Sequence, residues 1–204
     1  MSIRIAIGGS ACNPPHRGHL EMVRAVRDLR AFDRVRWDVC GARRDKPGMA
    51  PAADRIAMAH LTFPPEWDAV NDRLAHGPIV PTIRVLEETA RQYPPDTEIV
   101  WFTSVDLLIP QERHGGRSEV AACWVEGERL LTEWPCLVLP RRGYPHPRDV
   151  PLPLRAAVHD VEFPEISSTE IRRRIAAGEP FHDLVTPDVE RYIAMYGLYG
   201  WGKK

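Results

Sequence analysis

The chain opens with a β-branched run that ends in two glycines and leads at once into an amphipathic helix, and this junction constrains the fold most. Residues 3–9 have the sequence IRIAIGG, which is typical of a buried parallel strand that meets a loop. Between residues 18 and 29, apolar residues recur every three positions with arginines between them, which predicts an amphipathic helix. A strand that passes through a tight loop into a helix is the first half of a β-α-β unit.

The same alternation continues along the chain. We expect further strands at 34–40, 98–103, 136–139 and 158–161, and further helices at 54–61 and 82–91. Strands that alternate with helices of about ten residues favour a parallel sheet with right-handed crossovers. The sequence therefore predicts an α/β fold.

The last third of the chain carries two sets of helix start and stop signals. A capping box of the form S-x-x-E begins at Ser167, and Gly178 is the expected end of that helix. Thr186 precedes a proline at the first helical position, and Gly197 is the expected end of this second helix.

Length and composition exclude several classes of protein. The 204 residues fit a single functional domain, in which we distinguish a core at 1–165 from a helical part at 166–204. With 27 basic and 28 acidic residues the formal net charge is −1, so we expect no nucleic-acid partner and no anionic membrane surface. The apolar runs are far shorter than a transmembrane helix, and the first residues lack a signal-peptide pattern. Four cysteines without CxxC spacing indicate free thiols in a reducing cytoplasm.

The segment GSACNPPHRGH, residues 9–19, places two histidines at the start of the first helix. A helix N-terminus offers unpaired N–H groups and about half a positive charge, so it attracts phosphate. His16 and His19 are three residues apart and therefore lie on one side of the first turn, where two imidazole donors can stabilise charge that develops during a transfer. The alternative is a surface cap without chemistry. A zinc-protease site is not indicated, because its histidines are four residues apart.

A second candidate phosphate site is EISSTEIRRRI, residues 165–175. Three hydroxyl residues at 167–169 precede three arginines at 172–174, and this combination suits an oligophosphate. The alternative is that the hydroxyls only cap the helix and the arginines form a solvated face. Three arginines near the positive end of a helix are unfavourable without an anion, and this favours the phosphate interpretation.

Both segments resemble motifs of a known family. GSACNPPHRGH is similar to the GGTFDPPHxGH motif of the nucleotidylyltransferase superfamily, and EISSTEIR is similar to its ISST-x-IR motif. Further segments resemble the bacterial nicotinate-nucleotide adenylyltransferase family: DKPGMAPAADRIAM (45–58), GPIVPTIRVLEE (77–88), FTSVDLL (102–108), VLPRRGY (138–144) and the closing TPDVERYIAMYGLY. The resemblance covers most of the chain and implies a Rossmann-like, doubly wound parallel sheet with a helical C-terminal subdomain.

The resemblance also implies roles for individual residues. The implied catalytic residues are His16, His19, Lys46 and Arg172, with His19 nearest the reacting centre. Together with His16, His19 and Arg172, the implied ATP-binding residues are Gly8, Gly9, Ser10, Asp106 (at the ribose), Ile166, Ser167, Ser168 and Thr169. The implied acceptor-binding residues are Thr82, Trp124 and Arg141, and for Trp124 a place in the core is an equally good interpretation. The resemblance implies Mg²⁺ held by the ATP phosphates and no metal ligand from the protein.

The implied reaction transfers the adenylyl group of ATP to nicotinate mononucleotide in NAD biosynthesis, and it gives nicotinate adenine dinucleotide and pyrophosphate. The chain departs from the family at the acceptor, where Pro81 replaces a tyrosine and segment 111–123 is longer, and at Ser104, which replaces a glycine. One alternative is therefore another phosphorylated acceptor, such as nicotinamide mononucleotide or phosphopantetheine. The other is a catalytically silent, nucleotide-binding regulatory protein. The expected partners are ATP and a mononucleotide, and the resemblance allows for a homodimer.

Overall fold

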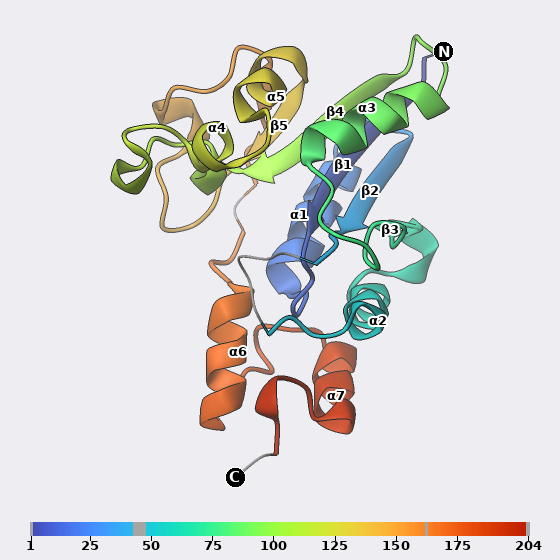
Figure 1. Ribbon diagram of the computed structural model, residues 1–204, viewed down its shortest axis with the longest axis vertical. Helices are drawn as coiled ribbons and strands as arrows, with labels where there is room; N and C mark the ends of the chain where they lie inside the picture. The colour runs from blue at the N-terminus through green and yellow to red at the C-terminus, as the bar shows by residue number, and fades with distance from the viewer. Residues whose placement is uncertain (1, 43–47, 162, 203–204) are drawn as a thin grey trace. The chain divides into compact units, whose positions relative to one another are not determined.

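The computed structural model describes residues 2–42, 48–161 and 163–202 of the chain. In this part of the chain, six strands form one sheet with the order β3-β2-β1-β4-β5-β6 (Figure 1). The strands are β1 (Arg4–Ser10), β2 (Arg34–Val39), β3 (Val70–Asn71), β4 (Glu98–Ser104), β5 (Cys136–Leu139) and β6 (Ala156–Val158). The pairings of β1 with β4, β2 with β3, β4 with β5 and β5 with β6 are all parallel. This order is that of a doubly wound, Rossmann-like sheet, so the predicted fold class is confirmed.

The helices follow the strands in alternation. They are α1 (Arg17–Asp28), α2 (Ala52–Thr62), α3 (Thr82–Gln92), α4 (Glu119–Cys123), α5 (Gly127–Glu133), α6 (Ser168–Ala177) and α7 (Pro187–Tyr196). The two predicted C-terminal helices are present with the predicted caps: the Ser167 hydroxyl accepts from the Glu170 N–H, and the Thr186 hydroxyl accepts from the Val189 N–H. Gly178 ends α6 in the left-handed conformation with φ +69°.

Three details differ from the sequence prediction. The last strand lies at Ala156–Val158 rather than at 158–161, because its register is set by pairing with the short β5, in which Cys136 faces Ala156 and Val138 faces Val158. The helices α4 and α5 were not expected, since five and seven residues are too few to show an apolar period. The strand β3 has two residues and leaves no pattern at all.

The chain clusters into two compact units, each built from three segments. The first unit comprises Met1–Gly8, Ala25–Val35 and Val80–Glu165, and the second comprises Gly9–Arg24, Arg36–Ile79 and Ile166–Lys204. The core of the first unit includes side chains of β1, α3, β4, α5 and β5, and Figure 1 shows α4 and α5 lying beside β5. In the second unit, Met58 of α2 packs with the apolar faces of α6 and α7. The functional division at residue 165 stays a prediction.

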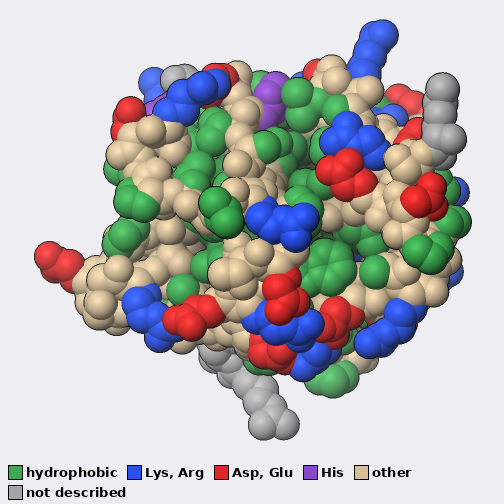
Figure 2. Space-filling model, turned by 90° about the horizontal axis from the view of Figure 1, so that it is seen from above, with side chains coloured by type: hydrophobic (Ala, Val, Ile, Leu, Met, Phe, Trp, Pro, Cys, Tyr) green, Lys and Arg blue, Asp and Glu red, His purple; other side chains and the backbone are tan. Residues whose placement is uncertain are grey.

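The surface agrees with the nearly balanced charge of the sequence. On the face shown in Figure 2, Lys and Arg side chains lie among Asp and Glu side chains rather than in separate regions of one sign. Among the described residues, every helix is too short or too polar to cross a membrane.

Candidate active site

The C-terminal end of β1 depends on glycines because other groups lie where side chains would be. A Cβ at Gly8 would come within 2.4 Å of the Phe102 ring in the first unit. A Cβ at Gly9 would come within 2.7 Å of the Asp38 carbonyl oxygen in the second unit. Gly8 and Gly9, near the end of β1, are therefore positions where only glycine fits without a shift of its neighbours.

The two predicted histidines lie together at the start of α1. Their rings are stacked, with the centroids 3.7 Å apart and the planes inclined by 19°. The His16 backbone N–H donates to Nδ1 of His19 over 3.3 Å, so this nitrogen is an acceptor and the ring proton of neutral His19 lies on Nε2. The His19 ring also contacts Trp37, with the centroids 5.1 Å apart. The loop thus holds His19 in one tautomer, and its ring contacts both His16 and Trp37 of β2.

The second predicted motif reaches the same loop directly. In α6, the Ser168 hydroxyl donates to the Pro14 carbonyl oxygen over 2.8 Å. Arg172 Nη1 donates to the Asn13 carbonyl oxygen over 2.7 Å, and its Nη2 donates to the Thr169 hydroxyl over 3.3 Å. The two motifs, about 150 residues apart in the sequence, are therefore joined by hydrogen bonds within one compact unit.

Of the three arginines in α6, only Arg172 is directed at the loop. Arg173 and Arg174 both contact the Glu170 carboxylate, at 2.8 and 2.9 Å. The hydrogen bonds from Arg173 and Arg174 lower the pKa of Glu170 to about 2. The electrostatic conflict expected for three arginines is thus resolved locally for two of them, and only Arg172 still supports the phosphate interpretation.

Arg55, to which the sequence pattern assigned no role, is a buried cation that contacts this loop at the Ala11 carbonyl. Its side chain in α2 is 2% exposed and makes no ion pair with any described carboxylate. Instead its guanidinium donates to four backbone carbonyl oxygens, those of Ala11, Cys40, Ala50 and Ala75, at 2.7–3.1 Å. Ala11 follows β1, Cys40 follows β2, Ala50 precedes α2 and Ala75 follows β3. One side chain therefore connects four loop segments of the second unit.

Asn13 is a second residue that connects loop segments and that the sequence did not single out for this role. Its Oδ1 accepts the Ala50 N–H at 2.9 Å and the Tyr199 hydroxyl at 3.0 Å. Burial is the largest cause that raises the pKa of Tyr199, which keeps its hydroxyl a donor at neutral pH. The only available signal for Asn13 was its place in the motif, since its partners are 37 and 186 residues away.

In the first unit, two predicted site residues contact each other. Asp106 lies two residues after the end of β4 and is 9% exposed. Its Oδ2 accepts from Arg141 Nη1 over 2.6 Å, and its Oδ1 accepts from the Ser104 hydroxyl. The predicted ribose-binding carboxylate and one predicted acceptor-binding residue are therefore neighbours.

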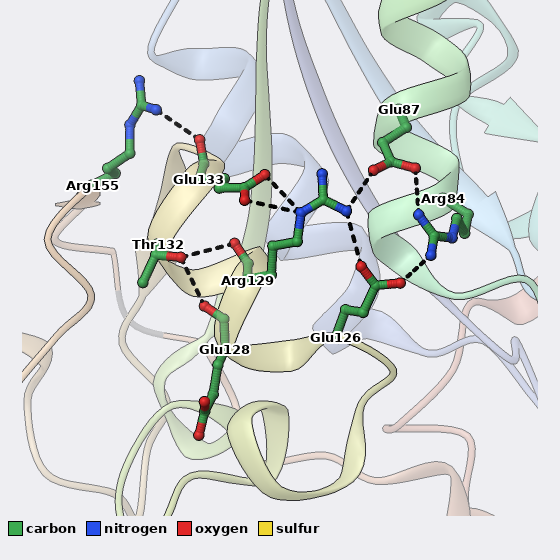
Figure 3. A network of polar contacts seen from close by, with 8 residues as sticks. All are labelled: Arg84, Glu87, Glu126, Glu128, Arg129, Thr132, Glu133 and Arg155. Carbon is green, nitrogen blue, oxygen red and sulfur yellow. Dashed lines mark hydrogen bonds and ion pairs between the residues drawn. The ribbon is translucent and has the colours of Figure 1, made fainter.

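Thr82 and Trp124 are each two residues away in the sequence from a member of one ion-pair network. Thr82 is the first residue of α3, and Trp124 follows α4 with its ring 6.2 Å from the Trp101 ring, packed against the core. Arg84, two residues after Thr82, contacts Glu126, two residues after Trp124. Figure 3 shows that Arg129 also contacts Glu126 and links this pair to further glutamates. The network ties the start of α3 to the turn that carries Trp124.

The predicted site residues are divided between the two units. Gly8, Thr82, Asp106, Trp124 and Arg141 belong to the first unit, whereas the histidines and the α6 motif belong to the second. Lys46 lies outside the described residues. No group of three or more His, Cys, Asp or Glu side chains that could hold a metal ion occurs in the described part of the chain.

Comparison with known proteins places this arrangement in a class. A family model described as cytidylyltransferase-like matches residues 7–174, a span that contains both motifs. The loop and helix therefore define a protein of the cytidylyltransferase-like class. In fold, the structure is similar to Plasmodium falciparum nicotinic acid mononucleotide adenylyltransferase complexed with NaAD, with a TM-score of 0.78 and 18% identity over 99% of this chain and 100% of that chain.

Sequence relatives narrow the class to one family. A probable nicotinate-nucleotide adenylyltransferase from Synechococcus sp. (strain JA-3-3Ab) is 34% identical over 96% of this chain and 94% of the relative. A second, from Thermus thermophilus, is 33% identical over 97% of this chain and 100% of the relative. The chain belongs to the nicotinate-nucleotide adenylyltransferase family.

Proposed function

We propose that this protein transfers the adenylyl group of ATP to nicotinate mononucleotide, releasing pyrophosphate and forming nicotinate adenine dinucleotide for NAD biosynthesis. One observation carries the proposal: the histidine loop and the N-terminus of α6 are joined through Ser168 and Arg172 within one unit. Two donors of the α6 motif thus hold two carbonyl groups of the histidine loop, which brings together the two segments predicted to bind phosphate. The names of the sequence relatives support the choice of acceptor.

The chemistry needs positioning and charge neutralisation. The acceptor's 5′-phosphate has a second pKa of about 6 and is largely ionised at neutral pH, so it attacks without a general base. Its oxygen forms a bond to the α-phosphorus of ATP while the bond to the β-phosphate bridging oxygen breaks, and pyrophosphate leaves with the electron pair. His16, His19 and Arg172, with Lys46, stabilise the charge that develops. Magnesium bound to the triphosphate would neutralise part of its charge.

The residues of the first unit are proposed to serve the acceptor and the ribose. Trp124 would pack near the pyridine ring, Thr82 and Arg141 would contact the rest of the acceptor, and Asp106 would accept from ribose hydroxyls. In the second unit, Gly9, Ser10, Ile166, Ser167 and Thr169 would surround the ATP phosphates, with Gly8 beside Gly9 in β1 and Ser168 holding the histidine-bearing loop. A cytoplasmic location is supported by four cysteines that are all free thiols, and a homodimer is proposed from the family resemblance alone.

The test is pyrophosphate release by the purified protein with ATP and Mg²⁺. Nicotinate mononucleotide, nicotinamide mononucleotide and phosphopantetheine are compared as acceptors at equal concentration. We expect release with the nicotinate compound at least ten times faster than with either alternative. Faster pyrophosphate release with another acceptor would identify that compound as the substrate, as Pro81 and segment 111–123 allow. ATP binding without pyrophosphate release would indicate a nucleotide-binding protein that does not catalyse the transfer.

A further inference from the structure

The three hydroxyls at the start of α6 are not equivalent as hydrogen-bond donors. A serine or threonine hydroxyl has one proton to donate and two lone pairs that accept. Phosphate oxygens at neutral pH chiefly accept, so a hydroxyl binds phosphate only with a proton that is not already donated elsewhere. The partners of each hydroxyl therefore decide which of them can hold a phosphate.

Ser167 and Thr169 use their hydroxyl oxygens as acceptors. The Ser167 oxygen accepts the Glu170 backbone N–H at 3.2 Å, and the Thr169 oxygen accepts from Arg172 Nη2 at 3.3 Å. Both hydroxyl protons can still be donated to a ligand. The backbone N–H groups of the first helical residues point in the same general direction, as at any helix N-terminus.

Ser168 differs because its hydroxyl is the donor in its contact. Its partner, the Pro14 carbonyl oxygen at 2.8 Å, can only accept, so the single proton of Ser168 is already engaged. Binding phosphate through this hydroxyl would leave the Pro14 carbonyl without its donor. The preceding carbonyl, that of Asn13, is held by Arg172 over 2.7 Å. Two residues after Pro14 the chain reaches His16, whose backbone N–H orients His19.

We propose that Ser168 is a positioning residue, which holds the histidine-bearing loop through Pro14, and that Ser167 and Thr169 donate the hydroxyl protons that bind phosphate. The inference rests on the proposed function for its effect on turnover. Its statement about phosphate binding needs only the hydrogen bonds of the three hydroxyls, including the contact of Ser168 with Pro14. A loop displaced by about 1 Å can slow a reaction by about 10²-fold, so the loss of one such contact reaches the chemical step.

The experiment compares matched variants of neighbouring residues. Ser168→Ala removes the donor to Pro14, Ser168→Thr keeps a hydroxyl, and Thr169→Val removes a hydroxyl at constant shape. Calorimetry gives the dissociation constant of pyrophosphate, and steady-state kinetics give kcat and the KM for ATP. Far-UV circular dichroism checks that each variant is folded, and Ser168→Cys, with a poor donor of similar size, replaces Ser168→Ala if that variant is unfolded.

We expect Ser168→Ala to bind pyrophosphate within about threefold of the unaltered protein while its kcat falls by about 10- to 100-fold. Ser168→Thr should recover most of the kcat, and Thr169→Val should weaken pyrophosphate binding by about tenfold or more. Pyrophosphate binding weakened as much by Ser168→Ala as by Thr169→Val overturns the inference, and so does an unchanged kcat in Ser168→Ala. If the unaltered protein transfers to no acceptor, the proposed function fails, but the pyrophosphate dissociation constants still decide which hydroxyl binds phosphate.

Discussion

Replacing Arg55 with methionine should destabilise the second unit more than any exposed arginine can. The substitution removes a guanidinium that is 2% exposed and leaves four carbonyl oxygens without their common donor. A hydrogen bond to a charged group contributes about 1.5–3 kcal/mol, so four of them contribute roughly 6–12 kcal/mol before opposing terms. Burying the cation costs several kcal/mol, and the substitution removes that cost as well.

The net effect is expected to be about 3–5 kcal/mol, because each buried carbonyl left without a donor costs about 1–3 kcal/mol and the relieved burial cost of the cation offsets part of the sum. Domains are stable by about 5–15 kcal/mol, so this is a large share of the total. For a chain of this size, about 2–4 °C is lost per kcal/mol, which gives a fall in Tm of roughly 6–20 °C. Arg55→Lys keeps the charge but has only three donors on one atom, so its loss should be about half as large.

Urea unfolding followed by circular dichroism measures these differences. The matched control is Arg24→Met in the same unit, where the side chain is 45% exposed and, among the described residues, pairs only with Glu21 in the same helix. Such a pair contributes about 0.3–0.5 kcal/mol, so the control substitution should hardly change the free energy of unfolding. A loss below about 1 kcal/mol for Arg55→Met would show that water or a rearranged backbone satisfies the four carbonyls, and the proposed tie between loops would be refuted.

Three further predictions concern single side chains. His19→Ala should reduce kcat by about 10²–10³-fold with the fold intact, because loss of one well-placed donor to developing charge costs about 2.7–4 kcal/mol. Hydrogen bonding from Arg173 lowers the pKa of Glu170 from 4.5 to about 2 in the folded protein, so the stability that this carboxylate contributes is present above pH 4.5 and is lost as the pH falls towards 2. The difference in urea midpoint between the unaltered protein and Glu170→Gln should therefore shrink below pH 4.5. A thiol reagent should modify the exposed Cys123 first, whereas burial raises the pKa of Cys136 and should protect it until the chain unfolds.

Each of these predictions has a result that contradicts it. Near-normal turnover of His19→Ala would remove this imidazole from the mechanism. A midpoint difference that stays constant from pH 7 to pH 3 would mean that Glu170 has an ordinary pKa in the folded state. Simultaneous modification of both cysteines in the folded protein would show that the first unit opens at β5 far more readily than its packing indicates.

The fold could be predicted largely because its signals are local. The strand at the beginning of the chain, the two C-terminal helices and their caps depend on residues within three or four positions of one another, as in the contact of Ser167 with the Glu170 N–H. The short helices α4 and α5 and the two-residue β3 escaped prediction for the same reason, since so few residues carry no period. The last strand was misplaced because its position follows from pairing with β5 rather than from its own residues.

The sequence by itself predicted which side chains form the candidate phosphate site, because each of the two motifs consists of consecutive residues at the start of a helix. Only the tertiary structure decided which hydrogen-bond partners each of these side chains has. Ser168 and Pro14 are 154 positions apart, and no local pattern shows that this hydroxyl has already donated its proton. The role of Arg55 is equally invisible, since its four acceptors are backbone carbonyls, which every residue carries. Side-chain identity is thus a property of the sequence, whereas the allocation of hydrogen-bond donors among distant acceptors arises only when the chain has folded.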